Sequence, residues 1–282
     1  MLPAVYIGFV YCPFRAGFRH LDFPIQARYP SPLSLMFANR LAAIVILSAA
    51  ALTAQTIPAG TALPVMLNSG LNAKGAKPNQ KIEGKLMQEV SLPDGRKFKS
   101  GSHVTGHVVS VSRPNGSGSR IVVQFDQLQD EHQAIPLHAG LRAVASSQNV
   151  FQAGVPVDAN SDYESSQSWT TKQIGGEVVF RGRGYVASDK GRVGIYNGTG
   201  VWGKIPASGD CPAGDGSNPQ QALWIFSTTA CGIYGFEHTK LDQSGLTPPL
   251  DQIAFSSDKD IDIRGGSGWL LVTNPAATGD QK

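Results

Sequence analysis

The runs His103-Val104-Thr105-Gly106-His107-Val108 and Ile121-Val122-Val123-Gln124-Phe125 decide the fold of this chain. In both runs, small or apolar residues occupy every second position, which is the period of a β-strand with one buried face. Between the runs lies Arg113-Pro114-Asn115-Gly116-Ser117-Gly118. Asn-Gly tolerates the positive φ angles of a tight turn, so the two runs are predicted to form a β-hairpin.

The same pattern continues toward the N-terminus of this hairpin. Every second residue from Leu63 to Leu67 is apolar, and Pro93-Asp94-Gly95 is a second turn signal. The segment Ile57–Leu137 is therefore interpreted as a series of short antiparallel strands joined by turns, which is typical of barrels and sandwiches. We predict an all-β fold, namely a distorted antiparallel β-barrel or sandwich with an inserted glycine-rich β subdomain.

The composition agrees with this prediction and restricts the partners. The 282 residues include 32 Gly and 18 Pro, and only 16% are charged, which favours many turns and few long surface helices. The formal charge of +3 arises within residues 1–54, which contain four arginines and one aspartate. Residues 55–282 are neutral overall, so they give no electrostatic sign of binding to nucleic acid or anionic lipid.

Residues 36–54 have the form of a secretory signal peptide. Met36–Arg40 is a short cationic start, Leu41–Ala51 is apolar, and small residues follow as far as Ala54. The apolar run is roughly half of the ~20 residues needed to span a bilayer, so it indicates export without a stable transmembrane anchor. A buried helix or an N-terminal membrane anchor is the alternative. No cysteine follows the run, which argues against a lipoprotein.

Residues 1–35 precede this signal and show neither helical nor strand periodicity. An export signal begins near the start of its chain, so we interpret Met36 as the natural start and residues 1–35 as an extension caused by start-site choice. A peptide from residues 1–35 in mass spectra of the native protein would contradict this interpretation.

The cysteines indicate a disulfide. Cys12 lies in the extension, which leaves Cys211 and Cys231 as the pair in the mature chain. An even pair in an exported chain predicts a bridge, which would stabilise the fold by roughly 3 kcal/mol for a loop of about 20 residues. A metal-binding or redox pair is the alternative, although the spacing is not that of Cys-x-x-Cys.

The C-terminal half contains short apolar runs punctuated by glycine. Glu177-Val178-Val179-Phe180 and Ala222-Leu223-Trp224-Ile225-Phe226 are examples, and a final hairpin is predicted around Gly265-Gly266-Ser267-Gly268. The predicted divisions are an extension at 1–35, a signal peptide at 36–54, a barrel formed by 55–141 and 258–274, a polar linker at 142–173, an inserted disulfide-closed β subdomain at 174–257 and a tail at 275–282.

Two segments imitate nucleotide-binding motifs. Gly198-x-x-x-x-Gly203-Lys204 starts like a phosphate-binding loop, but Ile205 stands where Ser or Thr would bind magnesium, and Pro206 follows. Gly182-x-Gly184-x-x-Ala187 imitates a dinucleotide fingerprint, but the chain then turns where a helix should begin. We predict no nucleotide and no other cofactor.

Two further segments imitate metal sites. Asp258-x-Asp260-x-Asp262 lacks the Gly and the bidentate Glu of a calcium loop, so we interpret the aspartates as the wet face of a strand, with an adventitious calcium site as the alternative. His103 and His107 lie in an extended setting, which separates them by about 13 Å at ~3.3 Å per residue. No metal ligands are predicted.

Aromatic residues of the C-terminal half form a candidate binding surface for a glycan or a peptide. Packing of these side chains in the core is the alternative. The candidates are Trp169, Trp202, Trp224, Tyr185 and Tyr196.

Three segments carry a resemblance to a known family. Ile57-Pro58-Ala59-Gly60-Thr61-Ala62-Leu63-Pro64-Val65, Lys99–Gly106 and Ser119–Leu128 resemble the C-terminal domain of TrbI-like proteins, the scaffold of type IV secretion and conjugation channels. That family builds a distorted β-barrel from an I-P-x-G-T strand, a P-x-G-S-x-L-x-G strand and an S-R-x-x-x-x-W/F strand. Its closing strand is similar to Ile261–Val272. The resemblance implies one barrel from Ile57 to near Val272, with about 142–257 inserted before the last strand.

This sequence departs from TrbI-like channel proteins in ways that bear on function. Those proteins carry a cytoplasmic tail, a membrane helix, a long proline-rich periplasmic stretch and a pore-lining helical segment, whereas here a short signal leads directly into the barrel. A shared fold does not establish a shared function.

The sequence thus favours an exported, non-catalytic protein of a bacterial envelope that acts as a scaffold or binding module. Its location would be periplasmic or outer-envelope associated, and its partner an envelope protein or glycan. The first alternative is a component of a type IV secretion-like channel. The second is a hydrolase acting on cell wall or polysaccharide, for which carboxylates are available at Glu177, Asp189, Asp210 and Glu237 although their spacing selects none of them. No catalytic residue is predicted.

Overall fold

The computed structural model describes residues 56–113, 118–130, 133–155, 169–182, 184–197, 200–212 and 219–276. All of them lie in one compact unit, Thr53–Lys282. The predicted extension at 1–35 and signal peptide at 36–54 lie outside the described residues, as does most of the predicted tail. Among the residues that are described, no helix has the length and apolar composition needed to cross a bilayer.

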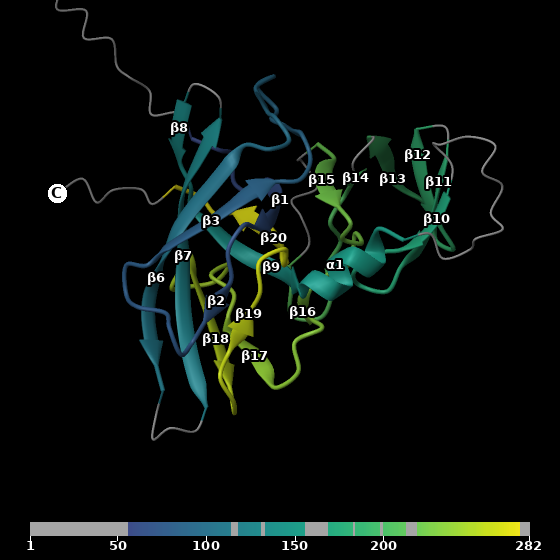
Figure 1. Ribbon diagram of the computed structural model, residues 1–282. Helices are drawn as coiled ribbons and strands as arrows, with labels where there is room; N and C mark the ends of the chain where they lie inside the picture. Colours follow the sequence, from purple (N-terminus) through teal and green to yellow (C-terminus); the bar gives the residue numbers. More distant parts are fainter. Residues whose placement is uncertain are drawn as a thin grey trace, which may run out of the picture. The chain divides into compact units, whose positions relative to one another are not determined.

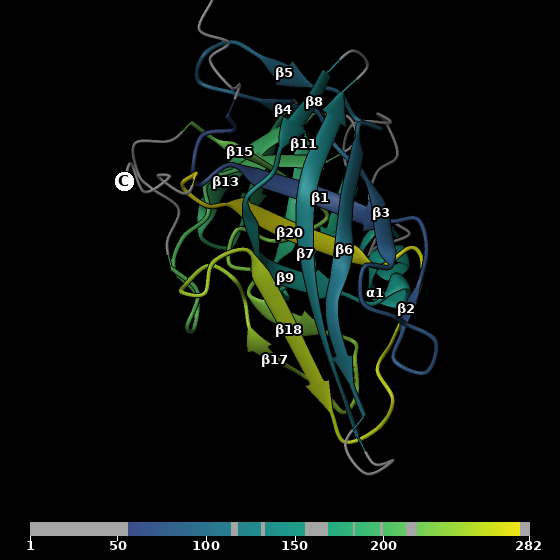
Figure 2. The same ribbon diagram turned by 90° about the vertical axis from the view of Figure 1, so that its left-hand side faces the viewer.

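The predicted all-β fold is confirmed, and its largest part is a ten-stranded, nearly closed barrel-like sheet (Figures 1 and 2). Its strands run in the order β16-β9-β20-β1-β3-β6-β7-β18-β17, and β8 pairs with β7 at one side. These strands are β1 (Ala62–Leu67), β3 (Lys81–Leu86), β6 (His103–Ser112), β7 (Ser119–Asp130), β8 (Gln133–Pro136), β9 (Ala139–Ala145), β16 (Gly232–Tyr234), β17 (Thr239–Gln243), β18 (Gln252–Ser257) and β20 (Gly268–Thr273).

Strands from the two ends of the described chain pair with each other inside this sheet, whose edges are β16 and β17. β1 pairs antiparallel with β20, with Ala62 opposite Val272 and Val65 opposite Trp269. The first strand of the described chain is therefore hydrogen-bonded to the last. The predicted hairpin is also present, since β6 and β7 pair antiparallel along their length. Its turn residues, 114–117, lie outside the described residues.

Three aromatic rings fill the middle of the barrel-like sheet. Trp269 makes edge-on contacts with Phe125 and Phe255, at ring-centroid distances of 5.5 Å in each case. All three side chains are fully buried, and each contributes roughly 2–3 kcal/mol of hydrophobic stabilisation. The interior is thus a packed core rather than a lumen.

One glycine of this sheet is required by close backbone approach. A Cβ atom at Gly106 would lie 2.2 Å from the carbonyl oxygen of Gln124, at a point where the register between β6 and β7 shifts. Any side chain at this position would push β6 and β7 apart, so only glycine fits here.

Two small pairs of strands lie beside the large sheet. β2 (Leu71–Asn72) pairs with β19 (Asp262–Ile263), and β4 (Val90–Ser91) pairs with β5 (Lys97–Phe98). The predicted turn at Pro93-Asp94-Gly95 joins β4 to β5. Gly95 takes a φ of 86°, and the Asp94 carboxylate accepts a hydrogen bond from the Arg96 backbone N–H at 3.0 Å.

The second sheet is a six-stranded half-barrel, which Figure 1 shows beside the large sheet. Its strands run in sequence order: β10 (Trp169–Lys172), β11 (Val178–Gly182), β12 (Tyr185–Ser188), β13 (Gly191–Asn197), β14 (Gly200–Gly203) and β15 (Gln221–Trp224). One short helix, α1 (Ser147–Ala153), precedes it and is capped by the Ser146 hydroxyl.

The two sheets share a second apolar cluster. Ala62, Ala143 and Leu270 face outward from the large sheet and join a cluster that includes Val179 and Phe226 of the half-barrel segment. Buried side-chain amides strengthen the contact: Gln221 accepts a hydrogen bond from the Ala62 N–H, and Gln88 accepts one from the Trp224 N–H. One face of the half-barrel is therefore covered by the barrel.

The strand pairing divides the chain differently from the predicted domain limits. β9 extends to Ala145, inside the predicted linker, and β16 to β18 lie within the predicted insertion at 174–257, yet all four belong to the ten-stranded sheet. The reason is long-range pairing: Ile253 and Phe255 of β18 lie opposite Val123 and Ile121 of β7. Helix α1 also lies within the predicted linker at 142–173.

The predicted disulfide is confirmed. Cys211 and Cys231 are bonded, with their Cα atoms 6.0 Å apart. Nearby, Arg142 of β9 is only 2% exposed, and its guanidinium donates to the carbonyl oxygens of Pro206 and Pro212 at 2.5 Å each. Burial lowers the pKa of Arg142 to about 10. The disulfide and Arg142 together fix the loop after β14 on the barrel.

Candidate functional site

The half-barrel carries a row of apolar side chains across neighbouring strands. Tyr185 of β12 lies opposite Ile195 of β13, and Ile195 lies opposite Trp202 of β14. Residues directly opposite each other in an antiparallel sheet project on the same side. These three side chains therefore line one face, and it is the face turned away from the second apolar cluster.

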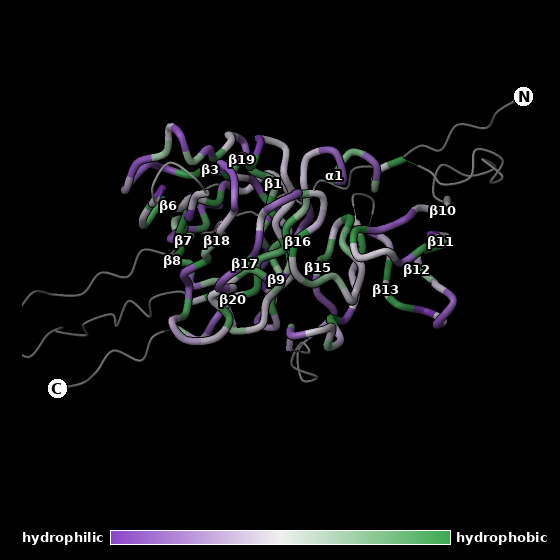
Figure 3. The backbone as a smooth tube through the Cα atoms, turned by 90° about the horizontal axis from the view of Figure 1, so that it is seen from below, coloured by the Kyte–Doolittle hydropathy of each residue, from purple (hydrophilic) through white to green (hydrophobic). Residues whose placement is uncertain are grey.

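A second row extends this face toward β11. Phe180 lies opposite Ala187, which follows Tyr185 by two positions, and the rings of Phe180 and Tyr185 are 6.2 Å apart. Val178 lies two positions before Phe180 on the same strand. Val178, Phe180 and Ile195 are 49%, 43% and 39% exposed, which is unusual for such side chains. We call Val178, Phe180, Tyr185, Ile195 and Trp202 the apolar face; Figure 3 colours parts of β11 to β13 as hydrophobic.

The apolar face ends in a groove of about 770 Å³. Ile195 and Trp202 contribute one wall, and Leu92 and Pro93 of the turn between β4 and β5 contribute another. The indole N–H of Trp202 is shielded from solvent, so Trp202 offers only ring carbon atoms to a partner. Contacts here would be made mainly through apolar surface.

The five predicted aromatic residues are not brought together. Tyr185 and Trp202 belong to the apolar face, and both are partly buried. Trp224 is only 8% exposed and packs against Phe226 in the second cluster, so its assignment to a binding surface is corrected to the core. Tyr196 points to the opposite side of β13 from Ile195 and packs against the same cluster. The side chain of Trp169 lies outside the described part of the chain.

Arg181 and Tyr196 interact behind the apolar face. Burial is the main influence on both: it lowers the pKa of Arg181 and raises the pKa of Tyr196. The Tyr196 hydroxyl therefore stays neutral under physiological conditions. This pair supports the covered side of the sheet and does not reach the apolar face.

The sequence prediction missed Val178, Phe180 and Ile195. The signal was present in Glu177-Val178-Val179-Phe180, where apolar residues occupy both sides of one strand. Val179 is fully buried, whereas its two neighbours are exposed. A short strand that is apolar on both sides indicates either a sheet whose two faces are both buried or a sheet with one exposed apolar face that serves as a contact surface.

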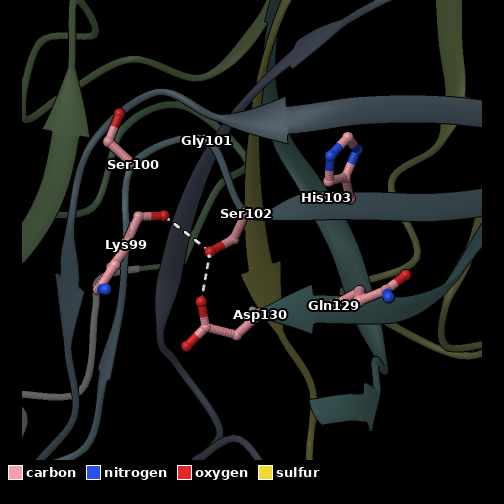
Figure 4. Close-up of a pocket in the computed structure, with 7 residues that line it drawn as sticks. All are labelled: Lys99, Ser100, Gly101, Ser102, His103, Gln129 and Asp130. Carbon is pink, nitrogen blue, oxygen red and sulfur yellow. Dashed lines mark hydrogen bonds between the residues drawn. The ribbon is translucent and has the colours of Figure 1, made fainter. Parts of the chain in front are cut away.

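A pocket of about 570 Å³ is lined by Ser102, His103 and Asp130, side chains of the types found in catalytic triads (Figure 4). The Ser102 hydroxyl lies 2.8 Å from the Lys99 carbonyl oxygen and 3.1 Å from an Asp130 carboxylate oxygen. His103 is the next residue of the same extended strand, and its ring lies on the other side, away from Ser102. The imidazole is therefore not placed to accept a proton from this hydroxyl.

The aspartates that imitate a calcium loop are occupied by cationic side chains. Asp260 pairs with Lys74 at 3.4 Å and with Arg113 at 2.9 Å, and Asp262 pairs with Arg264 at 3.5 Å. Within the described ranges, no group of three or more His, Cys, Asp or Glu side chains is placed to hold a metal ion.

The other motif-like segments lie in strands and in the turns between them. Gly182 ends β11 and Ala187 lies in β12, so the dinucleotide-like segment is a turn between two strands. Gly203 ends β14, whereas Gly198 lies outside the described residues. His103 and His107 both lie in β6 as predicted, and His107 is 2.7 Å from the Asp126 carboxylate.

The four carboxylates considered for a hydrolase come from separate turns and loops. Glu237 lines a pocket beside α1, together with Asp260 and Asp262. Glu177 and Asp189 belong to turns of the half-barrel, and Asp210 lies beside the disulfide. No two of these four carboxylates line the same cleft in the described part of the chain.

No protein-family model matches the chain, and no curated protein matches its sequence.

Proposed function

We propose that this protein is an exported, non-catalytic binding module of the bacterial envelope, and that it contacts a protein partner through the apolar face. The observation that carries the proposal is the exposure of Val178 and Phe180 of β11 and of Ile195 of β13 on one face of the sheet, with Tyr185 of the intervening strand β12 on the same face. Exposed apolar side chains that cluster in this way are typical of interaction sites.

A protein partner is favoured over a glycan because of the chemistry of this face. Sugar hydroxyls lose hydrogen bonds to water unless the site replaces them. Val178, Phe180 and Ile195 have no polar groups, and the Trp202 N–H is shielded. Apolar side chains of a protein need no such replacement and would gain about 25 cal/mol for each Å² that becomes buried.

Export and the TrbI-like resemblance are part of the same proposal. The disulfide is compatible with an oxidising compartment, which supports export. The pairing of β1 with β20 is the arrangement that the resemblance implies, and it supports a scaffold role. A channel component remains the alternative, and it predicts a large ring-shaped oligomer in light scattering of the purified protein.

Site-specific photo-crosslinking in the native envelope tests the proposal. A photoreactive amino acid replaces Ile195 in one variant and Leu250 in another, because both side chains are aliphatic and 39% exposed, but Ile195 lies in the half-barrel and Leu250 in the turn between β17 and β18. We expect a discrete protein adduct from position 195, lost on adding Phe180→Ser, and none from position 250. Equal adducts at both positions, or none at 195, would refute a partner at the apolar face.

A further inference from the structure

The apolar face is flanked by cations and has no acidic residue in its rows. Lys172 of β10 lies opposite Val178, and Arg192 of β13 lies opposite Ala187, which in turn lies opposite Phe180. Both cations therefore project on the same side as Phe180. The rows comprise Thr170, Lys172, Val178, Phe180, Gly182, Tyr185, Ala187, Arg192, Ile195, Trp202 and Ala222.

These two cations are not neutralised within the described part of the chain. Lys172 and Arg192 are both exposed, and neither forms a salt bridge there. Some exposed lysines elsewhere do have carboxylate partners, as Lys81 of the large sheet, Lys97 of β5 and Lys74 of the turn after β2 show. In the turn between β12 and β13, Asp189 and Lys190 offset each other. The apolar face thus carries two positive charges, although residues 55–282 are neutral overall.

We propose that the partner segment bound at the apolar face is an extended acidic peptide chain with alternating apolar side chains. This inference rests on the proposed function and adds the chemistry of the partner. In an extended chain, every second side chain points the same way. Apolar side chains would contact Phe180, Ile195 and Trp202, and the intervening carboxylates would approach Lys172 and Arg192 from the rim.

The dimensions of the site fit such a segment. From β11 to β14 the face covers three strand spacings, about 14 Å at ~4.8 Å each, which an extended chain crosses in about five residues. The groove between Trp202 and Pro93 lies at one end and would receive one terminal apolar side chain as an anchor. The carboxylate that lines this groove, Glu89, is paired with Lys97 at 3.0 Å, so the groove adds no unpaired negative charge. A bilayer surface would use the charges but not this groove, so the observations favour a peptide.

Defined peptides test this inference on the mature chain. Three blocked, fluorescently labelled peptides of about eight residues alternate Leu with Glu, Leu with Lys, or Ser with Glu, and their binding is followed by fluorescence anisotropy. We expect the Leu-Glu peptide to bind about tenfold more tightly than the other two, and more weakly as salt rises from about 0.05 M to 0.5 M.

Charge reversal locates the effect. Lys172→Glu with Arg192→Glu should weaken binding of the Leu-Glu peptide by about tenfold. Lys77→Glu with Lys240→Glu is the matched control, because both lysines are exposed on the large sheet or its loops, and it should leave binding unchanged. Equal binding of Leu-Glu and Leu-Lys, or equal effects of the two double variants, would overturn the inference.

The outcomes separate this inference from the proposed function. If Leu-Glu and Leu-Lys bind equally and Ile195→Ser abolishes both, the apolar face is a binding site but its charge does not select the partner. If no peptide binds, while vesicles of phosphatidylglycerol and phosphatidylcholine sediment the protein through Lys172 and Arg192, the inference is overturned in favour of a membrane surface. If neither peptides nor vesicles bind and position 195 gives no crosslink, both proposals fall.

Discussion

The ten-stranded sheet and the half-barrel differ in how completely their two faces are buried. In the large sheet, Trp269, Phe125 and Phe255 meet in a filled interior, and the outward residues Ala62, Ala143 and Leu270 are also covered. The half-barrel is fully covered on one side; on its other side Val178, Phe180 and Ile195 are exposed, whereas Trp202 packs against the core of the large sheet. Under the proposed function, the large sheet would supply stability and the half-barrel would supply contact.

The largest expected effect is at the centre of the barrel-like sheet. Trp269→Ala should lower the free energy of unfolding by about 3–5 kcal/mol, because it leaves a cavity between Phe125 and Phe255. Urea unfolding followed by circular dichroism measures this loss. Trp202→Ala, on the partly exposed side of the half-barrel, should cost clearly less; equal losses would remove the contrast between the two regions.

The disulfide should come next, because it joins the half-barrel segment to the large sheet. Replacing Cys211 and Cys231 by Ser should lower the free energy of unfolding by roughly 3 kcal/mol, as expected for a closed loop of about 20 residues. A reductant should lower the urea midpoint of the native protein to the same value and leave the double variant unchanged. An unaltered midpoint in reductant would show that the bridge contributes nothing to stability.

Arg142 should have a smaller effect on the same junction. Arg142→Lys keeps the buried charge but cannot reach both Pro206 and Pro212 with one ammonium group, so we expect a loss of about 1–2 kcal/mol. Arg113→Lys is the control, because Arg113 is 40% exposed and pairs at the surface with Asp260. If both variants unfold at the same urea concentration, Arg142 does not fix the loop.

The large sheet was readable from sequence because its strands alternate strictly. The signals are local ones. They are the alternating residues of β6 and β7, the turn residues at Gly95 and the family-like segments that contain β1 and β20. The domain limits were not readable, since β16 to β18 are short and are assigned to the large sheet only by pairing with distant strands. Helix α1 is a single short polar segment, and it gave no helical period.

The apolar face was readable only in part, for a related reason. Sequence identifies Trp202, Trp224 and Tyr196 as aromatic but not the side of the sheet on which each lies. Register shifts between Val186 and Ala187, and between Val201 and Trp202, change the side from one strand to the next. A single irregular position is enough to turn a predicted surface residue into a core residue.

A stabilising change on the covered side of the half-barrel would sharpen the comparison. Thr171 is fully buried, and its hydroxyl has no hydrogen-bond partner among the described residues. Thr171→Val removes this group at nearly constant shape, so we expect a gain of about 1 kcal/mol in the free energy of unfolding. Thr170→Val, one position earlier and facing the other side, should change stability less; a loss at position 171 would contradict this account.

The smallest effect on stability is expected where the effect on binding is largest. Ile195→Ser removes apolar surface that is already 39% exposed, and so does Leu250→Ser in the turn between β17 and β18. Each should change the free energy of unfolding by no more than about 0.5–1 kcal/mol, because neither opens a cavity in a packed core. With the photoreactive amino acid placed at position 180 instead of 195, only Ile195→Ser should abolish the crosslinked adduct. If Ile195→Ser instead destabilises the protein as strongly as Trp269→Ala, the exposed side of the half-barrel is part of the structural core, and the division between a region for stability and a region for contact does not hold.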